Sequence, residues 1–369
     1  MNILVISTVS YRANGIANVI RNLYVNDTFH NENMFFLFPL DNDESMISDL
    51  KNSGYKVFEF PRNKKNTIQY FCQVYHMVKS NHIQIVHIHG NSHSVTIELL
   101  ASFLAGCKIR ICHSHNTTCT HKAIHRLLTP AFGLLCTDRF ACGEEAGRWM
   151  YGNKEFRVVK NGIDTERFRY RENDRERVRF QYKIGEDEFI IGHIGNLNRQ
   201  KNQAFLIELI ADINLNRACK CLLVGEGENK DDLEKMVKDL GLEEKVFFCG
   251  TTKDVPAYLS AIDVIVMPSL YEGLPLSLIE AQASGLDCVV SGVITKEVNL
   301  TGKVYYVNNL NSKEDWLKEI EGKDIKKDRN KYSQNAINII RSSGYDIKAE
   351  VQELYEYYKD KVRSKPIGG

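Results

Sequence analysis

Short apolar runs alternate with longer amphipathic segments along the whole chain, and this alternation limits the possible folds more than any other feature of the sequence. It is typical of parallel sheets covered by helices. The predicted strands of the first half span residues 3–7, 55–60, 84–89, 108–113, 139–141 and 157–160. A second series spans residues 189–195, 220–225, 245–249, 264–267 and 288–291. The sequence therefore predicts an α/β fold with two sheets.

The length of the chain predicts two domains, because 369 residues exceed the roughly 100 to 200 residues of a typical domain. We expect an N-terminal Rossmann-like domain over 1–165, a charged linker over 166–185 and a second Rossmann-like domain over 186–345. Residues 346–369 predict a final amphipathic helix, which could pack against either domain. Two doubly wound domains that face each other across a cleft would bind ligands beyond the carboxyl ends of their strands.

Composition excludes several classes of protein. The 48 basic and 47 acidic residues give a formal charge of +1, which provides no global field for holding nucleic acid. Ten cysteines without a Cys-x-x-Cys pair or a secretory leader predict a reduced, cytosolic protein without a disulfide framework. No run approaches the roughly 20 apolar residues that a membrane-spanning helix requires.

Two carboxylates flank a predicted helix start in the segment 268–280. Glu272 precedes the start and Glu280 lies on the helix, which we expect Pro275 to open, because proline suits the first helical position. The free N–H groups around Gly273 and Leu274 would then bind phosphate, assisted by the helix dipole. The two carboxylates can accept hydrogen bonds from hydroxyl groups. Phosphate flanked by hydroxyls describes a nucleotide sugar.

A turn with two cations follows the predicted strand 189–195. It begins at Gly195 and Asn196 and carries Arg199 and Lys201. Lysine acts on phosphate as a point charge, and arginine can bind it as a fork. The alternative is a solvated basic turn. Together with the two carboxylates, a phosphate-binding turn is favoured.

Two other turns carry glycines that permit close approach of the backbone. Gly225 and Gly227 end a predicted strand but lack the third glycine of a dinucleotide-binding motif. Gly15 follows the first strand and would let the backbone approach a donor phosphate or an acceptor. An ordinary strand-to-helix turn is the alternative at both places.

Two histidines follow the predicted strand 108–113 of the first domain. His113 and His115 can hydrogen-bond a sugar hydroxyl or a phosphate, and one of them is expected to face the ligand. A histidine satisfied in the core is the alternative. Nearby side chains of zinc-binding type are Cys112, Cys119, His121 and His125. Their spacing matches no known zinc site, so we predict no metal.

Together these motifs resemble family four of the retaining glycosyltransferases, which have the GT-B fold, and within it the bacterial capsular and exopolysaccharide branch. The family motifs are the pair Glu272 and Glu280 within a Glu-x7-Glu pattern, Lys201, and Asn-Gly-Ile-Asp at 161–164. The resemblance to the branch rests on residues 87–92, 113–116 and 140–147.

The resemblance implies transfer of a hexose or N-acetylhexosamine from a nucleotide diphosphate sugar, with UDP expected, to a lipid-linked saccharide at the inner face of the cell membrane. It implies neither a metal ion nor another cofactor. By position, Glu280 would bind the ribose hydroxyls and Glu272 the donor sugar. Lys201 would bind the diphosphate and His115 a hydroxyl of the donor sugar.

Two positions depart from the family pattern. Many relatives have arginine directly after the glycine, where this chain has Asn196, and we expect Arg199 to replace that charge. The usual pair of glycines near the N-terminus is here Asn14 and Gly15. Weaker binding of the diphosphate would follow if Arg199 did not compensate.

Other interpretations of the sequence stay open. A nucleotide-sugar epimerase or a phosphorylase would share the two-domain architecture, and a non-catalytic regulatory partner would bind the nucleotide sugar without transferring it. The Asp-x-Asp pattern at 41–43, which holds metal in another glycosyltransferase architecture, is interpreted as a polar loop. The basic segments 62–65 and 108–126 suit either a solvated surface or peripheral contact with anionic lipid.

Overall fold

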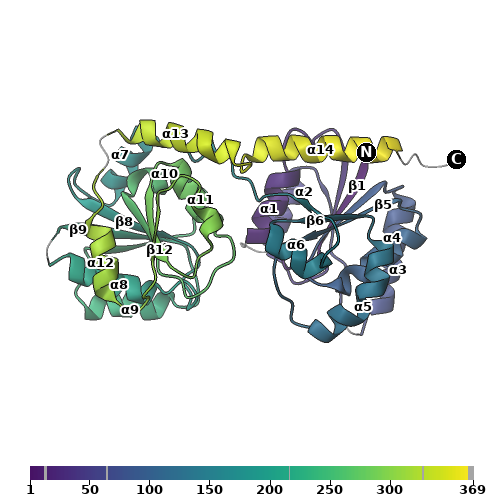
Figure 1. Ribbon diagram of the computed structural model, residues 1–369, viewed down its shortest axis with the longest axis horizontal. Helices are drawn as coiled ribbons and strands as arrows, with labels where there is room; N and C mark the ends of the chain where they lie inside the picture. Colours follow the sequence, from purple (N-terminus) through teal and green to yellow (C-terminus); the bar gives the residue numbers. More distant parts are fainter. Residues whose placement is uncertain (12–14, 64, 216, 326–327, 365–369) are drawn as a thin grey trace. The chain divides into compact units, whose positions relative to one another are not determined.

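The computed structural model describes residues 1–11, 15–63, 65–215, 217–325 and 328–364. The chain divides into two compact units. Unit 1 comprises Met1–Gly162 together with the chain from Ile347 onward, and unit 2 comprises Ile163–Asp346. Each unit contains one sheet with helices packed around it (Figure 1), and the predicted α/β fold class is confirmed.

The sheet of unit 1 is parallel, in the order β3-β2-β1-β4-β5-β6-β7. Its strands are β1 (Asn2–Ser7), β2 (Asn33–Leu37), β3 (Lys56–Phe58), β4 (Ile85–His89), β5 (Ile109–Ser114), β6 (Asp138–Ala141) and β7 (Arg157–Val158). The central strands are buried on both faces, which explains their continuous apolar runs. The order of the strands reverses between β1 and β4, so this is the switch point of unit 1.

Eight helices accompany this sheet among the described residues. They are α1 (Gly15–Tyr24), α2 (Glu44–Asn52), α3 (Thr67–Ser80), the 3-10 helix η1 (His93–Val95), α4 (Thr96–Leu104), α5 (Lys122–Leu135), α6 (Glu144–Tyr151) and α14 (Ile347–Ser364). The last of them, α14, comes from the far end of the chain and packs on α1. Its buried stripe contains Val351, Leu354 and Tyr358, and Tyr358 is fully enclosed. The aromatic ring of Phe29 packs against it.

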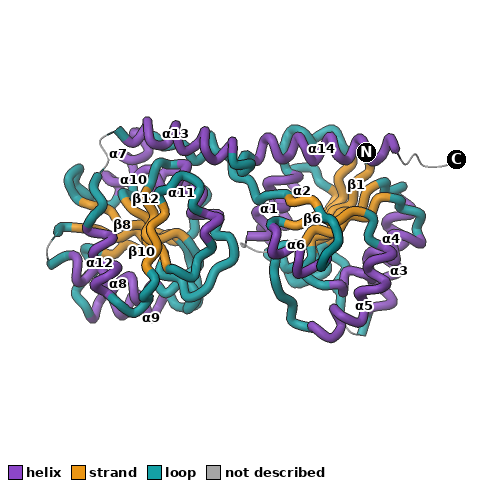
Figure 2. The backbone as a smooth tube through the Cα atoms, viewed as in Figure 1, coloured by secondary structure: helices purple, strands orange, loops and turns teal. Residues whose placement is uncertain are grey.

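The sheet of unit 2 is also parallel, in the order β10-β9-β8-β11-β12-β13. Figure 2 shows its strands in orange with helices around them. Its strands are β8 (Phe189–Ile194), β9 (Cys219–Val224), β10 (Val246–Gly250), β11 (Val264–Met267), β12 (Asp287–Ser291) and β13 (Val304–Val307). The order reverses between β8 and β11, which are hydrogen-bonded neighbours. Loops that leave these two strands at their carboxyl ends therefore meet at the switch point of unit 2.

The helices of unit 2 include the residues that we expected as a linker. They are α7 (Glu172–Gln181), α8 (Gln203–Ile213), α9 (Lys230–Asp239), α10 (Val255–Ala261), α11 (Leu276–Ala283), the 3-10 helix η2 (Lys296–Val298), α12 (Lys313–Glu321) and α13 (Arg329–Ser342). Helix α7 packs on α10, within unit 2.

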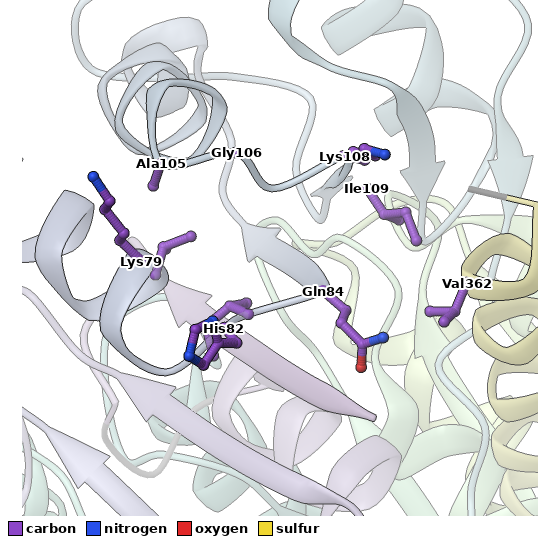
Figure 3. Close-up of a pocket in the computed structure, with 10 residues that line it drawn as sticks. Lys79, His82, Gln84, Ala105, Gly106, Lys108, Ile109 and Val362 are labelled. Atoms are coloured by element: carbon purple, nitrogen blue, oxygen red, sulfur yellow. The ribbon is translucent and has the colours of Figure 1, made fainter. Parts of the chain in front are cut away.

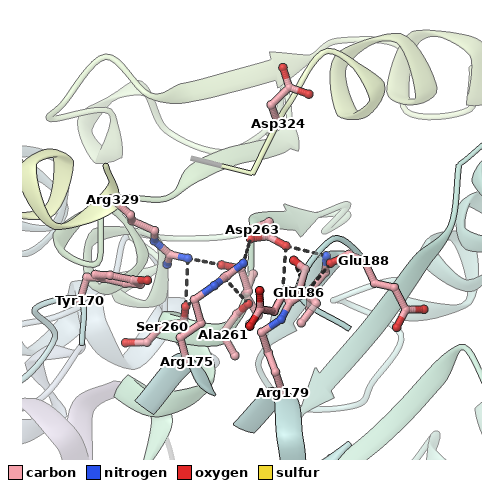
Figure 4. A network of polar contacts seen from close by, with 12 residues as sticks. Tyr170, Arg175, Arg179, Glu186, Glu188, Ser260, Ala261, Asp263, Asp324 and Arg329 are labelled. Carbon is pink, nitrogen blue, oxygen red and sulfur yellow. Dashed lines mark hydrogen bonds and ion pairs between the residues drawn. The ribbon is translucent and has the colours of Figure 1, made fainter. Parts of the chain in front are cut away.

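A buried ionic network anchors α7 and α13 in unit 2 (Figure 4). The Asp263 carboxylate lies 2.9 Å from Arg175 and 3.5 Å from Arg179, and it also accepts a hydrogen bond from the Ile190 N–H. Arg329 of α13 donates to the carbonyl oxygens of Ser260 and other residues near the end of α10. Because the charges are paired and hydrogen-bonded, their burial is tolerated.

The chain passes between the units at two positions that are adjacent in space. Within unit 2, the Ile163 N–H donates to the carbonyl oxygen of Tyr345 over 2.9 Å. Within unit 1, the Gly162 N–H donates to the Glu350 carboxylate over 2.8 Å. A Cβ atom at Gly162 would lie 2.8 Å from the backbone nitrogen of Ile347. Glycine is therefore required where the chain passes under the start of α14.

Among the described residues, no helix combines the length and the apolar character that crossing a bilayer requires.

Candidate functional site

Lys201 and Glu272 form an ion pair at the switch point of unit 2. The Lys201 Nζ lies 2.6 Å from the Glu272 Oε1. Lys201 lies in the loop after β8 and Glu272 in the loop after β11, so the pair joins the carboxyl ends of two neighbouring strands. The side chains are 15% and 7% exposed, which leaves the pair within reach of a ligand but largely shielded from water.

Backbone hydrogen bonds fix the two loops that carry this pair. The Leu270 N–H donates to the carbonyl oxygen of Gln200, and the Gln200 side chain donates to the carbonyl oxygen of Tyr271. Asn202 has a left-handed conformation, with φ of 57°, and its side chain donates to the carbonyl oxygen of Pro268. Asparagine tolerates this region better than most residues. The loops are therefore held in place by interactions within unit 2.

A buried histidine and a buried glutamine hold the loop that follows β8 through hydrogen bonds. Neither residue was identified from the sequence. His193 on β8 contacts the Val266 carbonyl oxygen through Nδ1, over 2.9 Å. Its Nε2 faces the side-chain amide of Gln203, which also donates to the carbonyl oxygen of Asn196. Burial lowers the pKa of His193 to about 4, so the ring is neutral. The only signal in the sequence was a histidine inside an otherwise apolar strand.

The two glycines after β9 serve packing between turns. A Cβ atom at Gly225 would lie 2.1 Å from the carbonyl oxygen of Gly195, and one at Gly227 would lie 2.2 Å from that of Leu197. The Leu197 N–H also donates to the carbonyl oxygen of Glu226. The close approach that we expected from these glycines is therefore to the Gly195 turn itself, which they hold at the switch point.

Helix α11 begins one residue later than predicted. Pro275 is the N-cap, with ψ of 100°, and Leu276 is the first helical residue. The prediction that Pro275 opens the helix was therefore wrong by one position, because the proline was taken to be helical. Glu280 lies on the second turn of α11 and is half-buried. Its carboxylate forms no hydrogen bond or ion pair with any described residue, whereas its backbone carbonyl accepts from the Ser284 N–H. Burial, opposed by Arg167, raises its pKa to about 7.

The remaining residues predicted for the donor site of unit 2 lie in the same two loops, after β8 and β11, and make fewer contacts. Asn196 and Arg199 are exposed, and the described residues offer Arg199 no ion pair. Gly273 is exposed, with open space where a side chain would be, whereas Leu274 packs against the core. The exposed Arg199 is thus free to move toward an anion.

Four histidines gather at the carboxyl ends of β4 and β5 in unit 1. His87 and His89 lie on β4, His113 on β5, and His115 directly follows β5. The His89 Nδ1 lies 2.7 Å from the His115 Nε2, and the rings of His113 and His115 stack with centroids 4.2 Å apart. His113 is fully buried, whereas His115 is partly exposed, so His115 is the member that a ligand can reach.

Two tyrosines complete this cluster from α1 and α14. The Tyr24 hydroxyl lies 3.0 Å from the His89 Nε2, and the Tyr358 hydroxyl hydrogen-bonds the His87 Nδ1. Desolvation lowers the pKa of all four histidines, that of His115 to about 3. The rings are therefore neutral near pH 7. The His115 Nδ1 is buried and has no hydrogen-bond partner among the described residues.

Three of these histidines are also the group best suited to a metal ion among the described residues. Nitrogen atoms of His87, His89 and His113 all lie within 4.8 Å of one another. However, both nitrogens of His89 have partners, and its ring stacks on that of His87 with centroids 4.7 Å apart. Zinc needs its ligands to converge at roughly 2 Å. The arrangement is better described as a stack of neutral rings.

Three other residues weighed for metal binding have structural roles. The His125 ring stacks on His93, with centroids 3.8 Å apart. Cys112 is fully buried in β5. The Asp43 carboxylate accepts from the N–H groups of Ser45 and Met46 and so caps α2.

The N-terminal turn is only partly described. Gly15 is the first residue of α1, which follows β1 at the switch point of unit 1. The predicted Asn14 lies outside the described residues, and so does Arg12.

A cavity of about 260 Å³ opens in unit 1 at the end of the strands opposite to the histidine cluster (Figure 3). Gln84 and Lys108, which line it, directly precede β4 and β5, and Val362 of α14 lies across from them. Ligands of α/β sheets bind beyond the carboxyl ends of the strands. This cavity lies at the amino ends of the strands, whereas the cluster of four histidines lies at their carboxyl ends.

Comparison with known proteins is consistent with this arrangement of residues. Residues 174–338 match the family described as glycosyl transferases group 1. EpsF of Bacillus subtilis, named as a glycosyltransferase, is 34% identical over 280 residues, which are 71% of this chain and 70% of EpsF. An Escherichia coli protein, UDP-Gal:alpha-D-GlcNAc-diphosphoundecaprenol alpha-1,3-galactosyltransferase, is 27% identical over 90% of this chain and 84% of its own.

Solved structures share the fold over nearly the whole chain. HepE of Anabaena, crystallised in complex with UDP, superposes with a TM-score of 0.78 at 18% identity and covers 98% of this chain and 100% of its own. WaaG, a glycosyltransferase involved in lipopolysaccharide biosynthesis, gives a TM-score of 0.62 at 14% identity and covers 99% of this chain and 100% of its own. The chain therefore belongs to the group 1 family of glycosyltransferases and has their GT-B fold.

Proposed function

We propose that the protein transfers a hexose or N-acetylhexosamine from a nucleotide diphosphate sugar, with UDP as the nucleotide, to a lipid-linked saccharide in capsular or exopolysaccharide synthesis. The observation that carries this proposal is the Lys201–Glu272 pair at the switch point of unit 2, four residues before α11 begins. A cation, a carboxylate and the first N–H groups of a helix lie together where α/β folds bind phosphate esters.

We base the proposed binding of the donor on the charged residues at the switch point of unit 2. Lys201 binds the diphosphate and Arg199 supplies a second cation in place of the arginine that Asn196 replaces. Glu280 accepts hydrogen bonds from the ribose hydroxyls, and Glu272 holds the donor sugar. The names of the Escherichia coli relative and of the HepE complex support a UDP-linked donor.

The transfer keeps the anomeric configuration and proceeds without a metal ion. The bond between the anomeric carbon and the diphosphate oxygen breaks while the acceptor oxygen bonds to that carbon on the same face. The acceptor's proton passes to the leaving phosphate. Lys201, Arg199 and the start of α11 stabilise the charge that develops on the diphosphate. His115, the partly exposed member of the histidine cluster, hydrogen-bonds a hydroxyl of the donor sugar.

A lipid-linked acceptor requires contact with a membrane surface, and two packed helices of unit 1 suit that contact. Helices α4 and α5 pack on each other and both expose large apolar side chains beside the basic residues Lys122 and Arg126. These side chains are Leu100, Phe103, Leu104, Ile124, Leu127 and Leu134. Apolar residues flanked by cations favour the interface of an anionic bilayer.

A donor screen tests the proposed transfer. The protein is incubated with a panel of nucleotide sugars and a diphosphoundecaprenol-linked saccharide, and release of the nucleoside diphosphate is measured. We expect release from a UDP-sugar that depends on the acceptor, loss of release in Glu272→Ala, and normal release in Glu234→Gln, an exposed carboxylate of α9. Acceptor-independent interconversion of one sugar would instead identify an epimerase.

Flotation with vesicles tests the membrane contact. We expect the protein to float with vesicles that contain phosphatidylglycerol and to stay behind with phosphatidylcholine alone. The double variant Leu127→Ser, Leu134→Ser should lose flotation. Phe180→Ser is the matched control, because Phe180 is equally exposed but lies on α7 of unit 2. Equal loss in both variants would refute a contact through α5.

A further inference from the structure

A second cavity of unit 1, of about 380 Å³, lies beside α5 and α6 and has no role in the reaction described above. Helix α5 contributes Lys122 and Arg126 to its lining, β6 contributes Arg139, and Trp149 lies on α6. Lys154, a few residues after α6, completes the set of cations. The volume is in the range of cavities that hold small organic ligands.

The lining of this cavity carries four cations and no carboxylate. None of Lys122, Arg126, Arg139 and Lys154 forms an ion pair within the part of the chain that the structure describes. The Nε of Arg139 is buried and has no hydrogen-bond partner in the described part of the chain. A chain with a formal charge of only +1 thus concentrates unpaired positive charge in one cavity. Such a cavity focuses the field on an anion, and the guanidinium groups suit phosphate oxygens.

One wall of the cavity is a stack of rings. The His125 ring lies between Trp149 and His93, with centroid distances of 4.9 and 3.8 Å. Burial, together with His93 and Arg126, lowers the pKa of His125 to about 4. The ring is therefore neutral near pH 7 and presents a flat, uncharged surface beside the cations. Phosphate charge and an organic group can both be accommodated.

The cavity is connected to His115 through one residue. The Trp149 Nε1 donates to the carbonyl oxygen of Asn91 over 3.3 Å. The side-chain oxygen of the same Asn91 accepts from the His115 N–H over 2.9 Å. Trp149, which lines the cavity, is thus linked through Asn91 to the histidine that is proposed to contact the donor sugar.

We infer that this cavity binds the phosphate or diphosphate ester that joins the acceptor saccharide to its carrier. The inference rests on the proposed transfer, in which both substrates carry phosphate. The donor diphosphate has its own cations, Lys201 and Arg199, in unit 2. A separate cationic cavity in unit 1 therefore matches the second phosphate-bearing substrate.

A quenching experiment tests binding without requiring activity. The chain has two tryptophans, and Trp316 is fully buried in unit 2, so iodide reaches Trp149 alone. Pyrophosphate should protect Trp149 from iodide in the wild type. The double variant Lys122→Gln, Arg126→Gln, which changes exposed side chains, should lose that protection. Arg148→Gln, on α6 but outside the lining, is the control and should keep it. Failure of pyrophosphate to protect the wild type would overturn the inference.

Kinetics identifies the source of the phosphate. With the lipid-linked acceptor, the double variant should raise the acceptor KM roughly tenfold or more per lost contact, with the donor KM unchanged. An unchanged acceptor KM, with UDP protecting Trp149 as well as pyrophosphate does, would refute an acceptor site and identify a nucleotide site. If no donor is turned over by the wild type, the proposed transfer fails, while the quenching result still decides whether the cavity binds phosphate.

Discussion

The Nζ of Lys201 lies 2.6 Å from the Oε1 of Glu272, and this contact joins the loops that follow β8 and β11. Of the two side chains, the glutamate is the more enclosed. In Lys201→Met the carboxylate would lose its cationic partner in a site nearly closed to water and keep only the 3.4 Å hydrogen bond from the Gln200 side chain. In Glu272→Gln the longer lysine can turn toward solvent.

The first prediction separates the contribution of this ion pair to the stability of the protein from its contribution to transfer activity. Lys201→Met should lower the free energy of unfolding by about 2 kcal/mol, and Glu272→Gln by less than half of that. The double variant should recover most of the loss, because no charge is left unpaired. Urea denaturation measures all three. All three should lack transfer activity, so recovery of activity in the double variant would contradict direct contact with the substrate.

The second prediction concerns the pH dependence of donor binding. Burial raises the pKa of Glu280 to about 7, so its carboxylate form increases as the pH rises from 6 to 8. A carboxylate accepts hydrogen bonds from two ribose hydroxyls better than a carboxylic acid does. Binding of UDP, measured by calorimetry, should therefore tighten across this range. Glu280→Gln should bind more weakly and without this inflection, and an unchanged inflection would assign it to another group.

The third prediction uses two glycines of the same site. Gly225→Ala would place a Cβ atom 2.1 Å from the carbonyl oxygen of Gly195 at a φ of 142°, so the turn must move. We expect a loss of about 2 kcal/mol in the free energy of unfolding and weaker UDP binding. Gly273→Ala is the matched control. Open space surrounds Gly273, so its variant should unfold like the wild type in thermal melts.

The fourth prediction concerns acid stability of unit 1. The folded pKa values of His87, His89, His113 and His115 lie below 6.5, so the unfolded chain binds more protons between about pH 3 and 6.5. The stability from the neutral rings is complete above pH 6.5 and is lost as the pH falls. Thermal melts from pH 7.5 to 5 should show this loss. His113→Phe, which keeps a buried ring, should reduce it, and an equally steep loss would rule out this source.

Sequence patterns predicted most of the sheet, because continuous apolar runs of five or six residues are typical of strands buried on both faces. They missed β2 and β13. Strand β2 follows a polar loop directly, and β13 contains tyrosines that stay half-buried at the edge of its sheet. Strand β2 is nevertheless a continuous apolar run from Met34 onward, so its local pattern also favours a strand. For β13 the neighbouring strand β12, rather than the local pattern, stabilises the extended conformation.

Site residues could be proposed from the sequence only where they lie next to a predicted strand end or helix start. Lys201, Glu272 and Glu280 could be proposed because each follows a strand or lies near a helix start, and the structure brings Lys201 and Glu272 into contact. His193 and Gln203, which support the loop, were not, because their contacts join residues far apart in the chain. The start of α11 was predicted one residue too early because proline suits both the N-cap and the first helical position.

The surface against which α14 packs could not be predicted from the sequence either. Its apolar stripe was visible, but a stripe does not specify the surface that covers it. The structure supplies that surface through Tyr24 and Phe29, which lie more than 300 residues earlier.

Since α14 belongs to unit 1, that unit is assembled from both ends of the chain. During synthesis, residues 1–162 leave the ribosome long before Tyr358, whose hydroxyl contacts the buried His87. Domains usually fold in the order in which they are made. Here the unit made first is completed last, after all of unit 2 has been synthesised, so a chain that ends before α14 would leave the histidine stack uncovered.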